Sequence, residues 1–98
     1  MLIPDAPAGQ IAIDLGLQGG APTPVSACAS GAEALRLAQM LLNDDRADIV
    51  LAGGSEAPVT RLGLVGFAPM RALSCRNEAP DQATRPYGTG RDGFVLSE

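Results

Sequence analysis

The sequence predicts an α/β fold in which mostly parallel strands alternate with helices. Residues 29–42 (ASGAEALRLAQMLL) have the periodicity of a helix. Residues 48–52 (DIVLA) form a compact apolar run of the kind found in strands that are covered on both faces. Residues 21–27 form a short extended run before the helix. This order of extended run, helix and buried strand is that of a βαβ unit with a right-handed crossover.

The chain before this unit predicts an extended entry and one helix. Residues 1–7 are Pro-rich and are expected to be extended. Residues 8–17 place apolar side chains on one face at helical spacing, at Ala8, Ile11, Ala12 and Leu15. The glycines that follow, beginning with Gly16, are expected to end this helix.

The helix at residues 29–42 is the strongest prediction. Glu33, Arg36 and Gln39 form one narrow polar stripe, and the other faces are apolar, which predicts a helix buried on most sides. Ser30 and Glu33 fit a capping box, which would start the helix within two residues of Cys28.

The second half of the chain shows weaker patterns. Residues 62–73 are apolar, but Gly63, Gly66 and Pro69 interrupt them, so no regular element is predicted there. Residues 74–91 are polar and rich in turn formers, and residues 94–96 are expected to be the first residues of a strand.

The composition excludes several kinds of chemistry. The 98 residues make one small domain at most, and they include no histidine and no lysine, which excludes an imidazole base, a Schiff base and a P-loop. The net charge of −4 argues against a nucleic-acid partner. The apolar run at residues 37–42 is too short to span a membrane. Two cysteines are too few for a disulfide framework, which favours the reducing cytoplasm.

Cys28 is the main candidate for a functional residue. It lies between a predicted extended run and the N-terminus of a helix, where free N–H groups and the helix dipole favour a thiolate. The same N–H groups can hold an oxyanion, and Gly31 would let a ligand backbone approach. The alternative is a small buried cysteine that packs as a hydrophobic side chain.

Two glycine motifs are weaker signals. Residues 53–57 (GGSEA) resemble the G-x-S-x-G nucleophile elbow, but Ala57 ends the motif and no histidine exists to activate Ser55. A hydrolase is therefore rejected, and the glycines are expected to permit a sharp turn or a close backbone contact. Residues 88–93 match G-x-G-x-x-G, but no strand precedes them and no helix follows, so a loop is expected.

The arginines are unevenly distributed. Five of the seven, from Arg61 to Arg91, lie after residue 60, where they favour an acidic docking partner. Such side chains can bind phosphate or carboxylate groups, although arginines are more often solvated or paired with nearby acids. Arg91 and Asp92 are expected to form a structural turn, and Cys75 lies in a polar loop as an incidental thiol.

Several motifs in register resemble the β-ketoacyl-[acyl-carrier-protein] synthases. They are VSACASG at residues 25–31, ADIVLAGGSEA at 47–57, ATRPY at 83–87 and RDGFVL at 91–96. The resemblance covers essentially the whole chain. It is closest to the elongating synthases of type II fatty acid synthesis, and the ketosynthases of polyketide synthases are similar enough to stay open.

The resemblance implies a thiolase-like fold of layered α/β/α halves, a homodimer, and no cofactor or metal. It implies that Cys28 takes an acyl chain from acyl carrier protein as a thioester. Malonyl-carrier protein is then decarboxylated, and its carbanion attacks the thioester to give a 3-oxoacyl product. Phe67 matches a residue that lines the acyl pocket, Gly63 lies in the adjacent loop, and Arg71 matches a basic position near the carrier-protein docking surface.

The resemblance also implies two histidines that this chain does not contain. Residues 1–98 are therefore expected to be a single fragment of the synthase N-terminal domain, inactive in condensation when isolated. A non-catalytic interaction or dimerisation module is an alternative, but such relatives replace the cysteine that is present at position 28. A thiolase that uses acyl-CoA is a further alternative, and the motifs from residue 85 to 96 argue against it.

Overall fold

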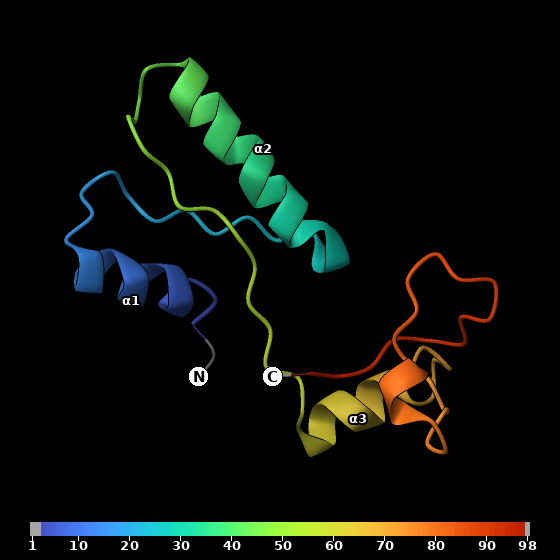
Figure 1. The fold of residues 1–98 in the computed structure, drawn as a ribbon. Coiled ribbons are helices and arrows are strands. Elements are labelled where there is room, and N and C mark those ends of the chain that lie inside the picture. Colours follow the sequence, from blue (N-terminus) through green and yellow to red (C-terminus); the bar gives the residue numbers. More distant parts are fainter. Residues whose placement is uncertain (1–2, 98) are drawn as a thin grey trace. The chain divides into compact units, whose positions relative to one another are not determined.

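The computed structural model describes residues 3–97, which divide into a first unit that ends at Ser55 and a second unit that starts at Glu56. Each unit is described by itself. The first unit contains helix α1 (Ala6–Leu15), the 3-10 turn η1 (Ala27–Ala29) and helix α2 (Ser30–Asn43) (Figure 1). The second unit contains helix α3 (Arg61–Phe67) and the 3-10 turn η2 (Pro80–Gln82).

Helix α1 confirms the predicted helix at residues 8–17, shifted by two residues toward the N-terminus. Of the extended entry predicted for residues 1–7, residues 1–2 lie outside the described residues, and Ala6 and Pro7 already belong to α1. Gly16 ends the helix in the left-handed region at φ 64°, and the N–H of Leu17 donates to the carbonyl of Ala12 at 2.8 Å. This is a Schellman ending, for which glycine is the favoured residue.

Helix α2 confirms the predicted helix at residues 29–42, but the predicted capping box is wrong. Ser30 is the first helical residue, and its side chain bonds back into η1 instead of capping α2. Glu33 pairs with Arg36 at 2.6 Å, so its carboxylate faces along the helix. The physical reason is that η1 already turns the chain before α2, which leaves Ser30 with helical backbone angles.

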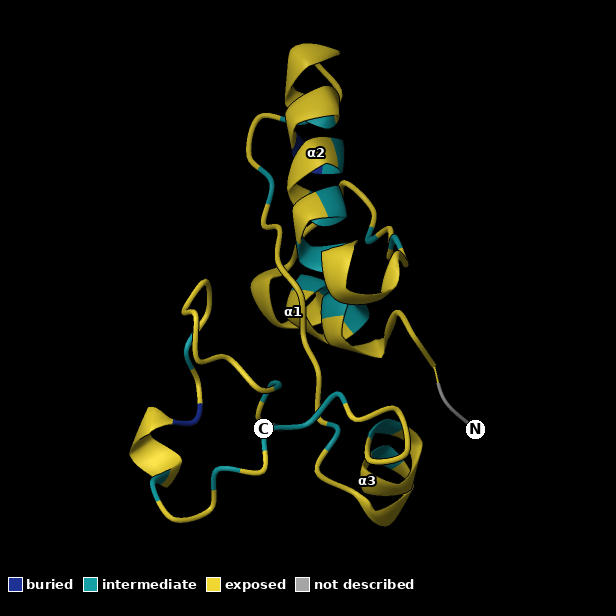
Figure 2. Cartoon of the chain, turned by 90° about the vertical axis from the view of Figure 1, so that its right-hand side faces the viewer, coloured by how far each residue is buried: buried dark blue, intermediate teal, exposed yellow. Residues whose placement is uncertain are grey.

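The prediction that α2 is buried on most sides is also wrong for the described chain. Ala38 is the one buried residue of α2, whereas the side chain of Leu35 is 61% exposed. Figure 2 shows α2 as a mixture of exposed and intermediate positions. An apolar helix face is buried only if other elements cover it, and residues 3–97 supply no sheet for it to pack on.

The α/β fold class is not confirmed, because residues 3–97 contain no strand. Residues 21–26 and 48–52 form neither helix nor strand, and Ala27 already belongs to η1. Ile49, within the second run, is 86% exposed. A strand exists only where a neighbouring strand accepts and donates its backbone hydrogen bonds. The apolar pattern of residues 48–52 therefore indicates a preference for a strand, but these residues form no strand within the described chain.

The sequence pattern does not predict helix α3, because glycines interrupt its apolar run. Thr60 caps it: its side-chain oxygen accepts a hydrogen bond from the N–H of Gly63 at 3.0 Å. A Cβ on Gly63 would collide with the carbonyl oxygen of Pro58, so glycine at this position permits the tight start of the helix. A local cap and a steric requirement thus outweigh the low helix propensity of glycine.

The loops of the second unit follow the prediction more closely. Residues 74–91 form turns and η2, and residues 88–93 are a loop, as expected. Phe94 pairs with Leu73 in an isolated parallel bridge, so the strand expected at 94–96 is reduced to one point of pairing. Within residues 3–97 no helix has the length and apolar character needed to cross a bilayer.

Candidate active site

Cys28 lies in η1, in the turn that leads directly into α2 (Figure 1). The preceding residue, Ala27, adopts the left-handed region at φ 50°, which an L-residue occupies at a cost of roughly 1–2 kcal/mol. The chain therefore passes through a sharp turn between a non-helical segment and a helix. A turn of this kind presents a nucleophile at the head of a helix in other enzymes.

Ser30 fixes this turn through its hydroxyl group. The Ser30 oxygen accepts a hydrogen bond from the N–H of Ser26 at 3.0 Å and donates to the carbonyl of Ala27 at 2.7 Å. The N–H of Ala29 also donates to the carbonyl of Ser26 at 3.0 Å. These hydrogen bonds connect the residues before Cys28 with those after it. They therefore hold the backbone of Cys28 in one conformation.

The Cys28 side chain is exposed and its thiol is free. Within residues 3–97, Cys28 is thus not packed as a buried hydrophobic side chain. The N–H of Ser30, the first residue of α2, donates to the carbonyl of Ala27, and the positive end of the dipole of α2 lies beside Cys28. The positive end of a helix dipole favours an oxyanion formed on attack at a carbonyl.

Gly31 and Gly54 bring the segment after residue 50 close to the start of α2. A Cβ on Gly54 would lie 3.5 Å from the Cα of Gly31 and 3.6 Å from its nitrogen. The close backbone contact predicted for the glycine pair at 53–54 is confirmed at Gly54. The Cβ position of Gly31 has one neighbour within 4 Å, the nitrogen of Gly54 at 3.9 Å, and the approach of a ligand backbone there stays a prediction.

In the second unit, the candidate residues Gly63, Phe67 and Arg71 follow one another along α3 and its exit. Phe67 ends α3 and is partly buried, and Arg71 lies in the turn beyond it at φ 53°. Gly63 has a steric role at the start of the helix, as described above. The structure thus places the three residues on one local element, whereas Cys28 belongs to the first unit.

Phe67 contacts Phe94 edge to face. Their ring centroids are 5.2 Å apart and their planes are inclined by 85°, an arrangement that aromatic pairs favour. Phe94 was not among the predicted site residues. Since 26 residues separate the two phenylalanines along the chain, no local spacing rule would have found the pair.

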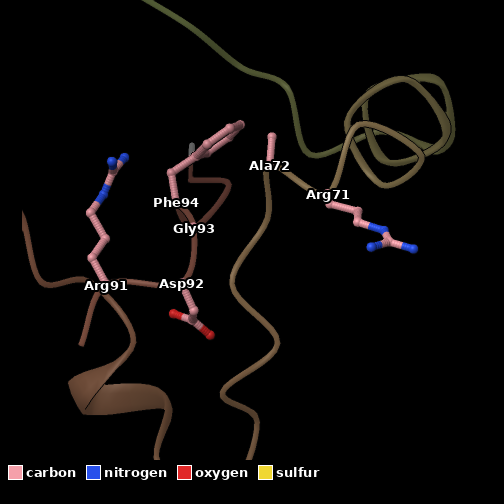
Figure 3. Close-up of a pocket in the computed structure, with 6 residues that line it drawn as sticks. All are labelled: Arg71, Ala72, Arg91, Asp92, Gly93 and Phe94. Carbon is pink, nitrogen blue, oxygen red and sulfur yellow. The ribbon is translucent and has the colours of Figure 1, made fainter. Parts of the chain in front are cut away.

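Arg71 lines a pocket of about 490 Å³ together with Ala72 and residues 91–94 (Figure 3). Figure 3 shows the guanidinium groups of Arg71 and Arg91 pointing away from each other, and the carboxylate of Asp92 pointing in a third direction. The two arginines therefore do not form a clamp around one anion. Arg71 is exposed, as a residue of a docking surface has to be.

Asp92 joins two loops of the second unit, a role that its sequence neighbourhood does not indicate. One carboxylate oxygen accepts a hydrogen bond from the Ser74 hydroxyl at 2.8 Å, and the other accepts from the N–H of Cys75 at 3.3 Å. The hydrogen bond from Ser74, with that from Cys75 and the charge of Arg76, holds the pKa of Asp92 below its ordinary value. The structural turn expected at Arg91 and Asp92 is therefore also a link to residues 74 and 75.

The described geometry is a thiol at a helix start, with an aromatic pair and an exposed arginine in the second unit. The family model for the N-terminal domain of beta-ketoacyl synthases matches residues 2–98. The chain belongs to the β-ketoacyl synthase family. This membership implies a ketosynthase domain of the thiolase-like class, although the described residues show only its helices.

Two relatives illustrate how similar this β-ketoacyl synthase chain is to known members. It is 44% identical over 98 residues to 3-oxoacyl-[acyl-carrier-protein] synthase 2 of Staphylococcus aureus. The matched region covers 100% of this chain and 24% of that protein. It is 45% identical over 92 residues to the protein of the same name from Rhizobium meliloti (strain 1021). That match covers 93% of this chain and 22% of the relative. The chain spans about a quarter of the length of these relatives.

Proposed function

We propose that the chain carries the nucleophile of an acyltransferase that condenses malonyl-acyl carrier protein with an enzyme-bound acyl chain to give 3-oxoacyl-acyl carrier protein. The observation that carries this proposal is the exposed, free thiol of Cys28 in the turn at the start of α2. The name of both relatives, 3-oxoacyl-[acyl-carrier-protein] synthase 2, supports the same reaction.

Cys28 acts in the first half of this reaction. Its thiolate attacks the thioester carbonyl of the acyl-carrier protein, and the N–H groups at the start of α2 stabilise the resulting oxyanion. The tetrahedral intermediate expels the carrier protein's thiolate, which takes up a proton, and leaves the acyl group on Cys28. In the second half, the carbanion formed by decarboxylation of malonyl-carrier protein attacks this thioester and releases the Cys28 thiolate.

The second half needs groups that these 98 residues do not contain. The chain has no histidine and no lysine, so imidazole or ammonium assistance to decarboxylation has to come from elsewhere. General acid–base catalysis is typically worth about 10²–10⁴-fold. We therefore assign acyl transfer to Cys28 and assign no condensation activity to the chain acting alone.

Three residues of the second unit are proposed to bind substrate. Phe67 lines the acyl pocket, Gly63 shapes the start of the helix that carries Phe67, and Arg71 contacts the carrier protein. The exposure of Arg71 and the concentration of arginine after residue 60 support an acidic partner, since charge complementarity speeds association. We further propose that residues 1–98 belong to one domain, and that the whole protein is a cytoplasmic homodimer.

The test is acylation of the chain by acyl-carrier protein, followed by mass spectrometry of the intact protein and its peptides. We expect one thioester, located on Cys28 and absent from Cys28→Ala. Cys75→Ala is the matched control, because Cys75 is the other free, exposed thiol, and it should be acylated like the wild type. A thioester that persists in Cys28→Ala would overturn the proposal, and acylation by acyl-CoA but not by carrier protein would point to a thiolase.

A further inference from the structure

We propose that Asp92 is a positioning residue for Phe67, acting through Ser74 and Phe94, and that it thereby helps to select the acyl chain. The selection part rests on the proposed function, in which Phe67 lines the acyl pocket. All four residues belong to the second unit of the chain.

The first step concerns the direction of the Phe67 ring. Phe67 is the last residue of α3, where the helix no longer restricts it from both sides. Its ring contacts that of Phe94 edge to face, with the centroids 5.2 Å apart. Because such contacts prefer a defined inclination of the rings, the position of Phe94 determines which direction of Phe67 is favoured.

The second step concerns the backbone of Phe94. Its N–H donates to the carbonyl of Ala72 and its carbonyl accepts from the N–H of Ser74, both at 2.9 Å. Gly93 lies so close to residues 72–74 that a Cβ on it would collide with the backbone of Leu73 and Ser74. Phe94 is therefore held against residues 72–74, and movement of Ser74 is transmitted to Phe94.

The third step concerns Asp92, which holds Ser74 from the other side. Its carboxylate accepts a hydrogen bond from the Ser74 hydroxyl at 2.8 Å and another from the N–H of Cys75 at 3.3 Å. The Ser74 oxygen in turn accepts the N–H of Arg76 at 3.3 Å. Asp92 is exposed, so its contribution here is these hydrogen bonds and not the filling of a core. Asp92 and Phe94 thus both form hydrogen bonds with the loop at residues 72–75, Phe94 through Ala72 and Ser74 and Asp92 through Ser74 and Cys75.

The test uses Asp92→Asn and Ser74→Ala, with Asp81→Asn as the matched control. Asparagine keeps the shape of Asp92 but turns one of its two acceptors into a donor, so it can accept a hydrogen bond from only one of the two groups, the Ser74 hydroxyl or the Cys75 N–H. Ser74→Ala removes the hydroxyl that Asp92 binds. Asp81 is an exposed acid of the same unit, in η2, outside this set of hydrogen bonds.

The first measurement is the nuclear Overhauser effect between the two ring-labelled phenylalanines, which is unambiguous because the chain contains only Phe67 and Phe94. The second is the yield of the Cys28 thioester across a series of acyl-carrier proteins from short to long chains. We expect the inter-ring signal to be lost, and the chain-length profile to flatten, in Asp92→Asn and Ser74→Ala. Both should be unchanged in Asp81→Asn.

The two measurements separate this inference from the proposed function. An inter-ring signal that persists in Asp92→Asn would overturn the inference, and so would a lost signal with an unchanged chain-length profile. If the wild type forms no thioester with any carrier protein, the proposed function and the selection of acyl chains both fail. The inter-ring signal then still decides whether Asp92 positions Phe67.

Discussion

Gly54 packs against Gly31 so that a Cβ on Gly54 would lie 3.5 Å from the Cα of Gly31, at ordinary van der Waals contact. The contact lies three residues after Cys28, at the start of α2. It brings the backbone that follows the apolar run at residues 48–52 beside the turn that presents the thiol.

Gly31→Ala is expected to stabilise α2. A Cβ on Gly31 meets only the nitrogen of Gly54, at 3.9 Å, and alanine has a helix propensity up to about 1 kcal/mol more favourable than that of glycine. Thermal unfolding followed by far-UV circular dichroism should show a higher midpoint. Gly53→Ala is the control, because Gly53 has open space around it and lies outside the helix. A lower midpoint for Gly31→Ala would show that the chain packs more tightly there than described.

Gly9 and Gly16 are expected to respond in opposite directions to alanine. Gly9 lies inside α1 with nothing within 4 Å of its Cβ position, so Gly9→Ala should stabilise the helix by about 0.5–1 kcal/mol. Gly16 caps α1 at φ 64°, so Gly16→Ala should destabilise it by roughly 1–2 kcal/mol. Denaturant titrations of both variants check the signs. Equal effects would contradict the left-handed cap.

Gly93→Ala is expected to separate Phe94 from Leu73. Its Cβ would collide with the backbone of residues 72–74, which cannot yield as a side chain would. The amide protons of Ser74 and Phe94 should exchange with solvent much faster than in the wild type, as hydrogen exchange measures. Gly90→Ala is the control, since its Cβ would meet the flexible end of Arg85, and it should leave this exchange unaltered.

The stability of the second unit is expected to fall in acid because of Asp92. The Ser74 hydroxyl, with the N–H of Cys75, lowers the folded-state pKa of Asp92 below its ordinary value of 3.8. A lowered pKa contributes stability that is fully present above the unfolded-state pKa and is lost as the pH falls through the folded-state pKa. Proton signals of Ser74 and Cys75, followed from neutral pH downward, should change below about pH 4.

Asp92→Asn should remove this part of the acid response, because asparagine does not ionise. If the wild type and Asp92→Asn lost the Ser74 and Cys75 signals with the same pH dependence, the carboxylate would not be the responsible group. Glu33 offers an internal comparison, since its pKa is also lowered, by hydrogen bonding to Arg36, but it lies on α2 in the first unit.

Cys28 is expected to react faster with iodoacetamide than Cys75. Both thiols are free and exposed, but Cys28 lies at the N-terminal end of α2, where the helix dipole is positive, and Cys75 lies in a loop. A dipole contribution of the usual size corresponds to about a two- to fivefold difference in rate. Peptide mass spectrometry after short labelling times measures the ratio. Equal rates would remove the helix as a source of reactivity.

The sequence by itself determined the features that depend on a few neighbouring residues. The periodicity of residues 8–17 and 29–42 predicted α1 and α2, and Gly16 was correctly expected to end α1. The motif around Cys28 placed the thiol at a helix start and indicated the family. These predictions succeed because helix propensity, capping by glycine and helical amphipathicity act over about one to four turns of chain.

Only the tertiary structure decided the features that join distant residues. Nothing near Asp92 in the sequence points to Ser74, 18 residues away, and nothing near Phe67 points to Phe94. The cap at Ser30 was mispredicted for the same reason on a smaller scale, since η1 changed which residue begins α2. Residues 48–52 show the converse: their apolar pattern favours a strand, but a strand is a relationship between two backbones, and a single segment cannot supply its own hydrogen-bond partner.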